Sequence, residues 1–155
     1  MTKTNAARIL DSLGVMYELA DYEVDENDLS AISVAEKLGQ DIDQVFKTLV
    51  LRGDKTGVFV CIIPGSAELD LKKTASASGN KSVSMVAVKE IPELTGYIRG
   101  GCSPVGMKKK YQSFIDETCT LYDRIYVSAG LRGLQMKISP ADLIKATESE
   151  IADLI

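Results

Sequence analysis

The side chains that could do chemistry in this chain do not include histidine. The sequence has 155 residues, with no His, no Trp and 3 Cys. A Ser-His-Asp or Cys-His triad, a histidine-ligated zinc ion and a histidine proton shuttle are therefore excluded. Any chemistry must come from lysine, carboxylates, hydroxyls, thiols, backbone groups or the substrate itself.

Lys47 is the first candidate for a functional side chain. It follows Phe46 at the start of an apolar segment, where the stem of a lysine can be buried. A partly buried lysine can hold an anion, and desolvation lowers its pKa toward that of a base. The alternative is a lysine on an edge strand that faces water, and the local pattern alone favours this alternative.

A second candidate is the segment Gly100-Gly101-Cys102-Ser103-Pro104-Val105-Gly106. Consecutive glycines allow a close approach of the backbone, and free N–H groups there could bind a carbonyl, phosphate or carboxylate. The spacing is neither that of a Walker loop nor that of a dinucleotide-binding fingerprint. A tight loop fixed by its proline is the alternative, and the sequence favours neither.

Cys102 is a candidate nucleophile within that segment. Without histidine, its thiol would need Arg99, a lysine or a helix N-terminus to lower its pKa, so an ordinary loop cysteine is favoured. The 3 cysteines show no CxxC spacing. We therefore expect no disulfide framework and no cysteine-ligated zinc site. We also expect no other metal and no cofactor. Ser128 and Gln135 flank a glycine-bounded turn. Polar residues at such strand ends often line clefts, although satisfied surface polar residues are commoner.

Charge is unevenly distributed along the chain. There are 18 basic and 22 acidic residues, a net charge of −4, and the stretch 18–28 holds six acids and no base. A globally acidic protein is not a general nucleic-acid binder, so we expect no binding to double-stranded DNA. One window without acids could contact a single phosphate-bearing end, although composition alone favours a solvated surface turn; its bases are Arg99, Lys108, Lys109 and Lys110.

The sequence also predicts the compartment. No apolar run approaches the roughly 20 residues of a membrane span. Residues 1–20 do not resemble a signal peptide, because Asp11 and Glu18 interrupt them. We therefore expect a soluble cytoplasmic protein that does not bind a membrane.

Periodicity and capping residues predict the elements that must position these side chains. Helices are expected over 4–13, 30–38, 41–44, 68–77 and 88–94 and after Ser139-Pro140, and strands over 15–19, 46–51, 58–63, 83–85, 96–99, 125–128 and 134–138. The turns 53–57 and 129–133 predict two hairpins, and the acidic stretch an exposed loop. Strands and helices mix without strict alternation, which favours an α/β (mixed α+β) fold in one domain over residues 1–155.

Four segments, in this order along the chain, resemble the YbaK/EbsC family: 43–49, 69–73, 95–106 and 127–134. The resemblance covers essentially the whole chain, and Gly100 to Pro104 matches the GxxxP loop of the family. The family includes free-standing aminoacyl-tRNA editing proteins and the editing domain of bacterial prolyl-tRNA synthetases.

This resemblance implies a compact domain with a mixed, partly closed sheet and surrounding helices, which clears a wrong amino acid from tRNA, cysteine on tRNA(Pro) above all. It implies that the thiol of the substrate, not an enzyme nucleophile, attacks the ester carbonyl. Lys47 would hold the terminal adenosine or polarise the ester, and the amides of Gly100 and Gly101 would stabilise developing negative charge. The implied partners are the acceptor end of mischarged tRNA and a prolyl-tRNA synthetase.

The resemblance also implies substrate-binding positions, which are Tyr22, Ser30, Phe46, Ser103, Pro104, Ser128 and Gln135. Ser30 stands where an aromatic residue is frequent and Gln135 where an aspartate is found, so alanine or another small amino acid stays open as the substrate, with water as the nucleophile. A non-enzymatic regulatory or tRNA-binding protein on the same fold also stays open, as does a hydrolase that uses Cys102.

Overall fold

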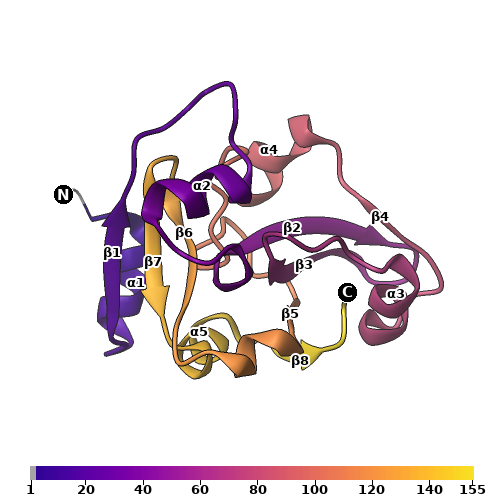
Figure 1. Cartoon of the computed structure of the whole chain (residues 1–155). Helices are drawn as coiled ribbons and strands as arrows, with labels where there is room; N and C mark the ends of the chain where they lie inside the picture. The colour runs from indigo at the N-terminus through magenta and orange to yellow at the C-terminus, as the bar shows by residue number, and fades with distance from the viewer. Residues whose placement is uncertain (1–2) are drawn as a thin grey trace.

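Two β-sheets form the framework of the computed structural model, which describes residues 3–155 (Figure 1). One sheet is antiparallel, in the order β1 (Tyr17–Asp21), β7 (Leu134–Ile138) and β6 (Ile125–Leu131). The other has the order β4 (Val83–Met85), β2 (Phe46–Gly53), β3 (Gly57–Pro64), β5 (Ser113–Asp116) and β8 (Glu150–Ala152). Its β3–β5 and β5–β8 pairs are parallel and its other pairs antiparallel. The expected mixed α/β fold is therefore confirmed.

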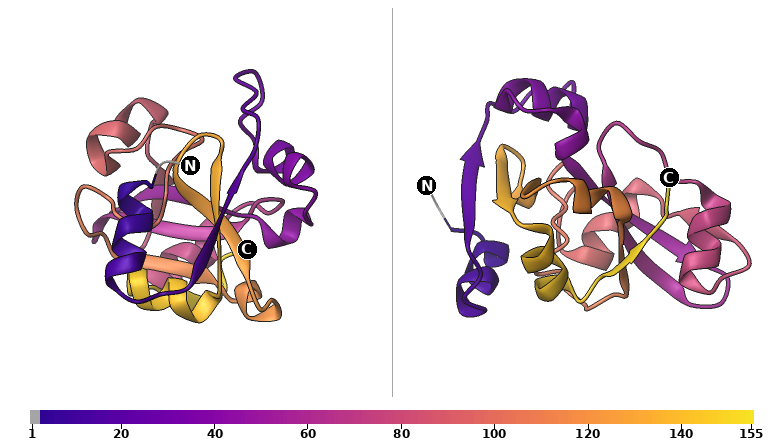
Figure 2. Two further views of the ribbon diagram at one scale, coloured as in Figure 1. Left: turned by 90° about the vertical axis from the view of Figure 1, so that its left-hand side faces the viewer. Right: turned by 60° about the horizontal axis from the view of Figure 1, so that its bottom comes forward.

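The two sheets meet just before β2. Val45 forms a parallel bridge to Tyr126 of β6, which joins the three-stranded sheet to the start of β2. Figures 1 and 2 show that the strands of the two sheets run at a steep angle to each other beyond this junction. The result is the partly closed sheet that the family resemblance implied.

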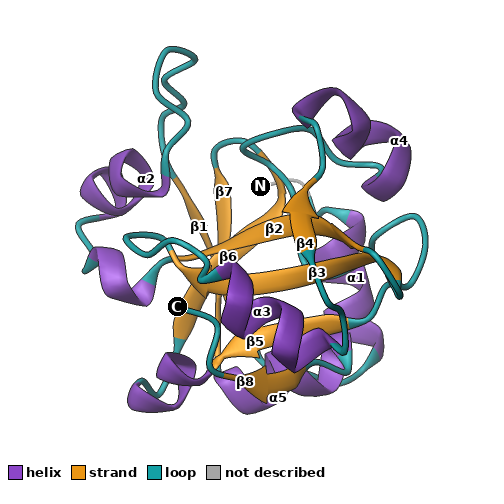
Figure 3. Cartoon of the chain, turned by 90° about the vertical axis from the view of Figure 1, so that its right-hand side faces the viewer, coloured by secondary structure: helices purple, strands orange, loops and turns teal. Residues whose placement is uncertain are grey.

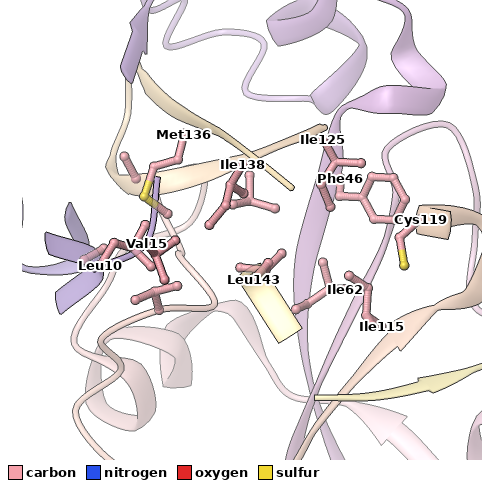
Figure 4. Packing of buried hydrophobic residues seen from close by; sticks show 14 of the residues in the cluster. Leu10, Val15, Phe46, Ile62, Ile115, Cys119, Ile125, Met136, Ile138 and Leu143 are labelled. Carbon is pink, nitrogen blue, oxygen red and sulfur yellow. The ribbon is translucent and has the colours of Figure 1, made fainter. Parts of the chain in front are cut away.

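The main hydrophobic core fills the space between the two sheets (Figure 4). Phe46 and Ile62 from the five-stranded sheet pack with Met136 and Ile138 from the three-stranded sheet, and all four are at most 3% exposed. Leu10 and Leu143 close this core from two helices. Burying one such side chain stabilises a fold by about 1.5–3 kcal/mol, so this core holds the sheets together.

Short helices cover the outer surfaces, and they are α1 (Asn5–Ser12), α2 (Ala31–Leu38), α3 (Leu71–Ser78), α4 (Ile91–Thr95), α5 (Pro140–Thr147), and the 3₁₀ turns η1 (Ile42–Gln44), η2 (Val88–Glu90) and η3 (Glu117–Leu121). Ser30, Asp70 and Ser139 each accept a backbone amide at a helix N-terminus, which satisfies a donor that the helix leaves free. Helix α3 lies over the outer face of the five-stranded sheet (Figure 3), whereas α2 and α4 both lie above β2 in the view of Figure 1.

Most expected elements are present, but the strand expected over 96–99 is wrong. Gly96 ends α4 in the left-handed conformation, with φ of 81°. The amide of Gly101 donates to Ile98 O at 2.9 Å, so residues 98–101 form a turn. Tyr97 instead reaches across the following loop and donates its hydroxyl to Val105 O at 2.6 Å.

The acidic stretch is only partly the exposed loop that was expected. Glu18 and Asp21 lie in β1. The remainder projects beyond the rest of the chain (Figure 2, left). Two basic side chains contact it: Lys37 Nζ donates to Glu23 O at 2.6 Å, and Arg132 pairs with Glu26 at 2.9 Å. No helix among residues 3–155 is long and apolar enough to cross a membrane.

Candidate active site

A cavity of about 520 Å³ opens beside β2. Its walls come from β2, α2, the segment that follows β3, η2, α4, the turn at Gly100, and the strand residues Ser128 and Gln135. The volume lies in the range of about 300–1,000 Å³ that is typical of small-ligand sites. The cavity therefore brings together residues from the two sheets and from the loops above them.

Lys47 lies in the wall of this cavity rather than on open surface. Its side chain is half-buried, and its ammonium donates to Gly65 O at 3.2 Å. Burial lowers the pKa of Lys47, and nearby Glu68 acts in the opposite direction. Because an ammonium has three N–H donors, two of them stay available to a ligand in the cavity.

The free edge of β2 also faces the cavity. β2 pairs with β3 along its whole length but with β4 only from Leu51 onward. The amide of Val60, in β3, donates to Gln112 O on the side away from β2. Along an antiparallel pair, residues alternate between those whose N–H and C=O bond to the partner strand and those whose N–H and C=O point away from it. Ile62 lies two residues after Val60, so its N–H and C=O also point away from β2. Thr48, which lies opposite Ile62, therefore directs its N–H and C=O to the free edge of β2.

Two buried polar atoms in the cavity wall lack a hydrogen-bond partner among residues 3–155. They are Thr48 Oγ1 and Gln135 Oε1. Gln135 is only 5% exposed. An unsatisfied buried polar group costs about 1–3 kcal/mol and is rare in folded proteins. These two atoms are therefore available to accept a hydrogen bond from a polar group in the cavity.

The turn at Gly100 approaches the cavity with its backbone. Gly100 lines the cavity and has φ of 86°, a conformation that favours glycine. No residue in 3–155 accepts a hydrogen bond from its amide. The amide of Gly101 is already donated to Ile98 O, so the expectation of two free glycine amides is wrong at Gly101. A Cβ on Gly101 would lie 3.0 Å from Arg132 N, so this glycine allows close packing of the turn.

Cys102 lines the same cavity, but its chemistry does not suit a nucleophile. Burial raises the pKa of its thiol to about 11, partly offset by a hydrogen bond with Thr95. The thiol is therefore protonated at neutral pH, whereas attack requires the thiolate. The hypothesis of a hydrolase that uses Cys102 is not supported by this environment.

The sequence-predicted site residues fall into two groups. Seven of them line the cavity: Ser30, Phe46, Lys47, Arg99, Gly100, Ser128 and Gln135. Seven do not: Tyr22, Gly101, Ser103, Pro104, Lys108, Lys109 and Lys110. Ser103 and Pro104 are buried behind the turn, and Tyr22 packs in a small cluster with α2.

The three lysines of the basic window are exposed and lie outside the cavity. Lys110 forms an ion pair with Glu148, and Lys108 Nζ donates to Glu93 O at 3.3 Å. Of the four expected tRNA contacts, only Arg99 lines the cavity.

Sequence reasoning missed Thr48 and the apolar rim of the cavity. Ile32, Met85 and Val88 line the opening, and each is about half exposed. A threonine within an apolar strand gives no signal in the sequence. Only the strand order shows that the edge of β2 at Thr48 is unpaired. Within residues 3–155, no group of three or more Cys, Asp or Glu side chains is arranged to hold a metal ion.

Comparisons with known proteins agree with this architecture. The family model described as the aminoacyl-tRNA editing domain matches residues 25–146. EbsC of Enterococcus faecalis (strain ATCC 700802 / V583), whose name proposes a Cys-tRNA(Pro)/Cys-tRNA(Cys) deacylase, is 47% identical over 152 residues, 98% of this chain and 93% of EbsC. The proline–tRNA ligase of Thermosipho melanesiensis (strain DSM 12029 / CIP 104789 / BI429) is 30% identical over 98 residues, 59% of this chain and 17% of the ligase.

A solved structure also shares the fold over nearly its full length. It is described as a candidate trans-editing enzyme for prolyl-tRNA synthetase, and it superposes with a TM-score of 0.84 at 25% identity, covering 99% of this chain and 98% of that one. The segment that the family model matches contains Lys47, the turn at Gly100, and the two strands that carry Ser128 and Gln135. This chain therefore belongs to the aminoacyl-tRNA editing domain family.

Proposed function

We propose that the protein is an aminoacyl-tRNA deacylase that clears mischarged tRNA, with Cys-tRNA(Pro) as its first substrate. The observation that carries this proposal is the half-buried ammonium of Lys47 in the wall of the cavity of about 520 Å³. The 47% identity with EbsC over 98% of this chain supports the same activity and amino acid. In this proposal residues 1–155 act as one editing domain.

The proposed reaction uses the thiol of the substrate as the nucleophile. The cysteinyl sulfur attacks the ester carbonyl carbon and loses its proton, and the C–O bond to the terminal ribose then breaks. The ribose oxygen takes up a proton, and the cysteine leaves as a thiolactone. Because attack is intramolecular, orientation alone can supply about 7–11 kcal/mol of the barrier in well-aligned cases.

Two groups of the cavity wall fit the negative charge that develops on the carbonyl oxygen. The Lys47 ammonium retains free donors, and the amide of Gly100 has no acceptor among residues 3–155. Donors fixed in place before the reaction stabilise such an oxyanion without reorganisation. Cys102 stays a neutral thiol in this scheme, since its pKa is about 11.

The acceptor end of tRNA is the proposed ligand of the cavity mouth. Arg99 lies at the mouth, and Lys108, Lys109 and Lys110 are proposed to contact phosphates further along the acceptor stem. The acidic total charge makes the affinity for tRNA alone modest. A prolyl-tRNA synthetase that holds the tRNA is therefore the proposed partner in the cytoplasm.

Purified protein incubated with Cys-tRNA(Pro), Ala-tRNA(Pro) and Pro-tRNA(Pro) tests the proposal. We expect fast loss of cysteine, recovered as a thiolactone or its trapped adduct, and slow loss of proline. Loss of alanine at a similar rate would assign water as the nucleophile and a broader specificity. No deacylation of either mischarged tRNA would reject the proposal.

The role of Lys47 is tested in the same assay by Lys47→Ala. Lys137→Ala is the matched control, because Lys137 is also a partly buried strand lysine but does not line the cavity. We expect the first variant to lose activity and the second to retain it. Full activity of Lys47→Ala would remove Lys47 from the mechanism.

A further inference from the structure

We propose that Thr48 and Gln135 bind the α-ammonium group of the esterified amino acid, so that the enzyme acts on tRNA carrying a free amino acid and rejects N-acylated aminoacyl-tRNA. This inference rests on the proposed function and adds a substrate class to it. It assigns a binding role to Thr48 and a defined ligand to Gln135.

The first observation is a group of unpartnered hydrogen-bond acceptors at one part of the cavity wall. Thr48 Oγ1 and Gln135 Oε1 are buried and have no partner among residues 3–155. Gln135 lines the cavity, so its Oε1 can accept a hydrogen bond from a ligand there. The Thr48 carbonyl adds a third acceptor, because it points to the unpaired edge of β2.

The surrounding structure holds these acceptors in place. Gln135 lies in the middle strand of the three-stranded sheet, between Ala20 of β1 and Ser128 of β6. Ser128 is itself fixed, since its hydroxyl accepts the amide of Gly130 at 3.1 Å. Thr48 is fixed by the pairing of β2 with β3. Strand pairing in this way fixes the backbone positions from which these acceptors line the cavity.

The second observation is that donors lie elsewhere in the same cavity. Lys47 contributes free ammonium N–H groups and Gly100 a free amide. An aminoacyl ester offers a carbonyl oxygen, which needs donors, and an α-ammonium, which has three donors and needs acceptors. The two parts of the wall therefore match the two polar groups beside the bond that is cleaved.

An N-acyl group removes this match. Acylation eliminates the positive charge, leaves one N–H, and adds bulk where Thr48 and Gln135 close the wall. Hydrogen bonds to charged groups contribute about 1.5–3 kcal/mol, compared with about 1 kcal/mol for neutral pairs. A site of this kind spares tRNA whose amino acid has already been incorporated into a peptide.

The test compares the mischarged tRNA that the wild type cleaves fastest with its N-acetylated form, which keeps its side chain unmodified. The measured quantity is the ratio of kcat/KM for the free and acetylated substrates, each corrected for spontaneous hydrolysis. Thr48→Val and Gln135→Met remove the acceptors at nearly constant volume. Thr74→Val is the matched control, because Thr74 is fully buried but donates to Asp70 O in the first turn of α3, away from the cavity.

We expect the ratio of kcat/KM for the free and acetylated substrates to be about ten or more in the wild type and in Thr74→Val. Each cavity variant should lower this ratio by about tenfold, as expected for the loss of one charge-assisted hydrogen bond. Thermal unfolding of each variant shows that it is folded. Equal cleavage of both substrates by the wild type, or an unchanged ratio in both cavity variants, would overturn the inference. Failure to cleave any free substrate would instead reject the proposed function.

Discussion

Replacing Lys47 by methionine separates the contribution of its charge to catalysis from its contribution to folding. Methionine keeps the apolar stem of the side chain and removes the ammonium. Two unit charges about 4 Å apart interact with about 4 kcal/mol at an effective dielectric constant of 20. Lys47 is only half-buried, so solvent screens this interaction. We take half of the energy, about 2 kcal/mol, as the lower bound of its contribution. Since 1.36 kcal/mol is a factor of ten in rate, Lys47→Met should lower kcat/KM by about 30-fold to 1,000-fold.

The same change should leave the stability of the fold nearly constant. Loss of the hydrogen bond to Gly65 O costs about 1 kcal/mol. Removal of the charge compensates, because burial disfavours the protonated form of Lys47, as its lowered pKa shows. We expect the free energy of unfolding at pH 7 to change by less than about 1 kcal/mol.

The difference in the free energy of unfolding between the wild type and Lys47→Met should increase with pH. The folded-state pKa of Lys47 lies below the ordinary value of 10.5. The folded state therefore holds this proton less tightly than the unfolded state, and the wild type gains stability as the pH rises from the folded-state pKa toward 10.5. Lys47→Met lacks this gain, so the wild type should become relatively more stable in that range.

Urea unfolding at pH 7 and pH 10, together with deacylation of Cys-tRNA(Pro), measures both effects. A fall in activity with unchanged stability supports a role for the ammonium in the reaction. If stability falls by several kcal/mol along with activity, Lys47 is structural and the reasoning is refuted. Wild-type activity of Lys47→Met would refute it as well.

Three further outcomes follow from other parts of the chain. Cys102→Ala should keep activity within a few-fold, and a loss of activity would support Cys102 as the nucleophile after all. Iodoacetamide should react with Cys102 slowly at pH 7 and faster toward pH 11, since burial raises the pKa of its thiol to about 11. Asp116→Ala should lower the free energy of unfolding by about 2–4 kcal/mol in a denaturant titration, because this fully buried carboxylate accepts from Leu154 N at 2.9 Å and from Thr118 N and Oγ1 at 3.1 and 2.7 Å. The double variant Lys109→Ala and Lys110→Ala should weaken tRNA binding and reduce the slope of log affinity against log salt by up to about 2; an unchanged slope would remove these lysines from the interface.

The elements with local signals were predicted well from the sequence. The hairpin of β2 and β3 follows from two apolar segments around a glycine-bounded turn, and α2 begins at the capping hydroxyl of Ser30 and ends at Gly39. The strand expected over 96–99 failed because Tyr97 and Ile98 have strand-like composition, whereas Gly96 and Gly100 both adopt positive φ and turn the chain.

The strands β5 and β8 were missed because their stability is not local. Each is only three or four residues long, and each pairs in parallel with a strand far away in the sequence. Such strands are specified by the neighbours that cover them rather than by periodicity. The same limit applies to the site: Lys47, Gly100 and Gln135 could be named from motifs, but the unpaired edge at Thr48 exists only in the assembled sheet.

The pairing of β1 with β7 has a consequence for how this site is formed in time. Tyr17 lies opposite Ile138, so the three-stranded sheet closes only after residues from near both ends of the chain have met. Pairings of such large sequence separation raise the contact order and slow folding. Gln135 lies in β7, so its place in the cavity wall depends on this late pairing. Substitutions in β1 that slow refolding should therefore delay the recovery of activity as much as the recovery of the sheet.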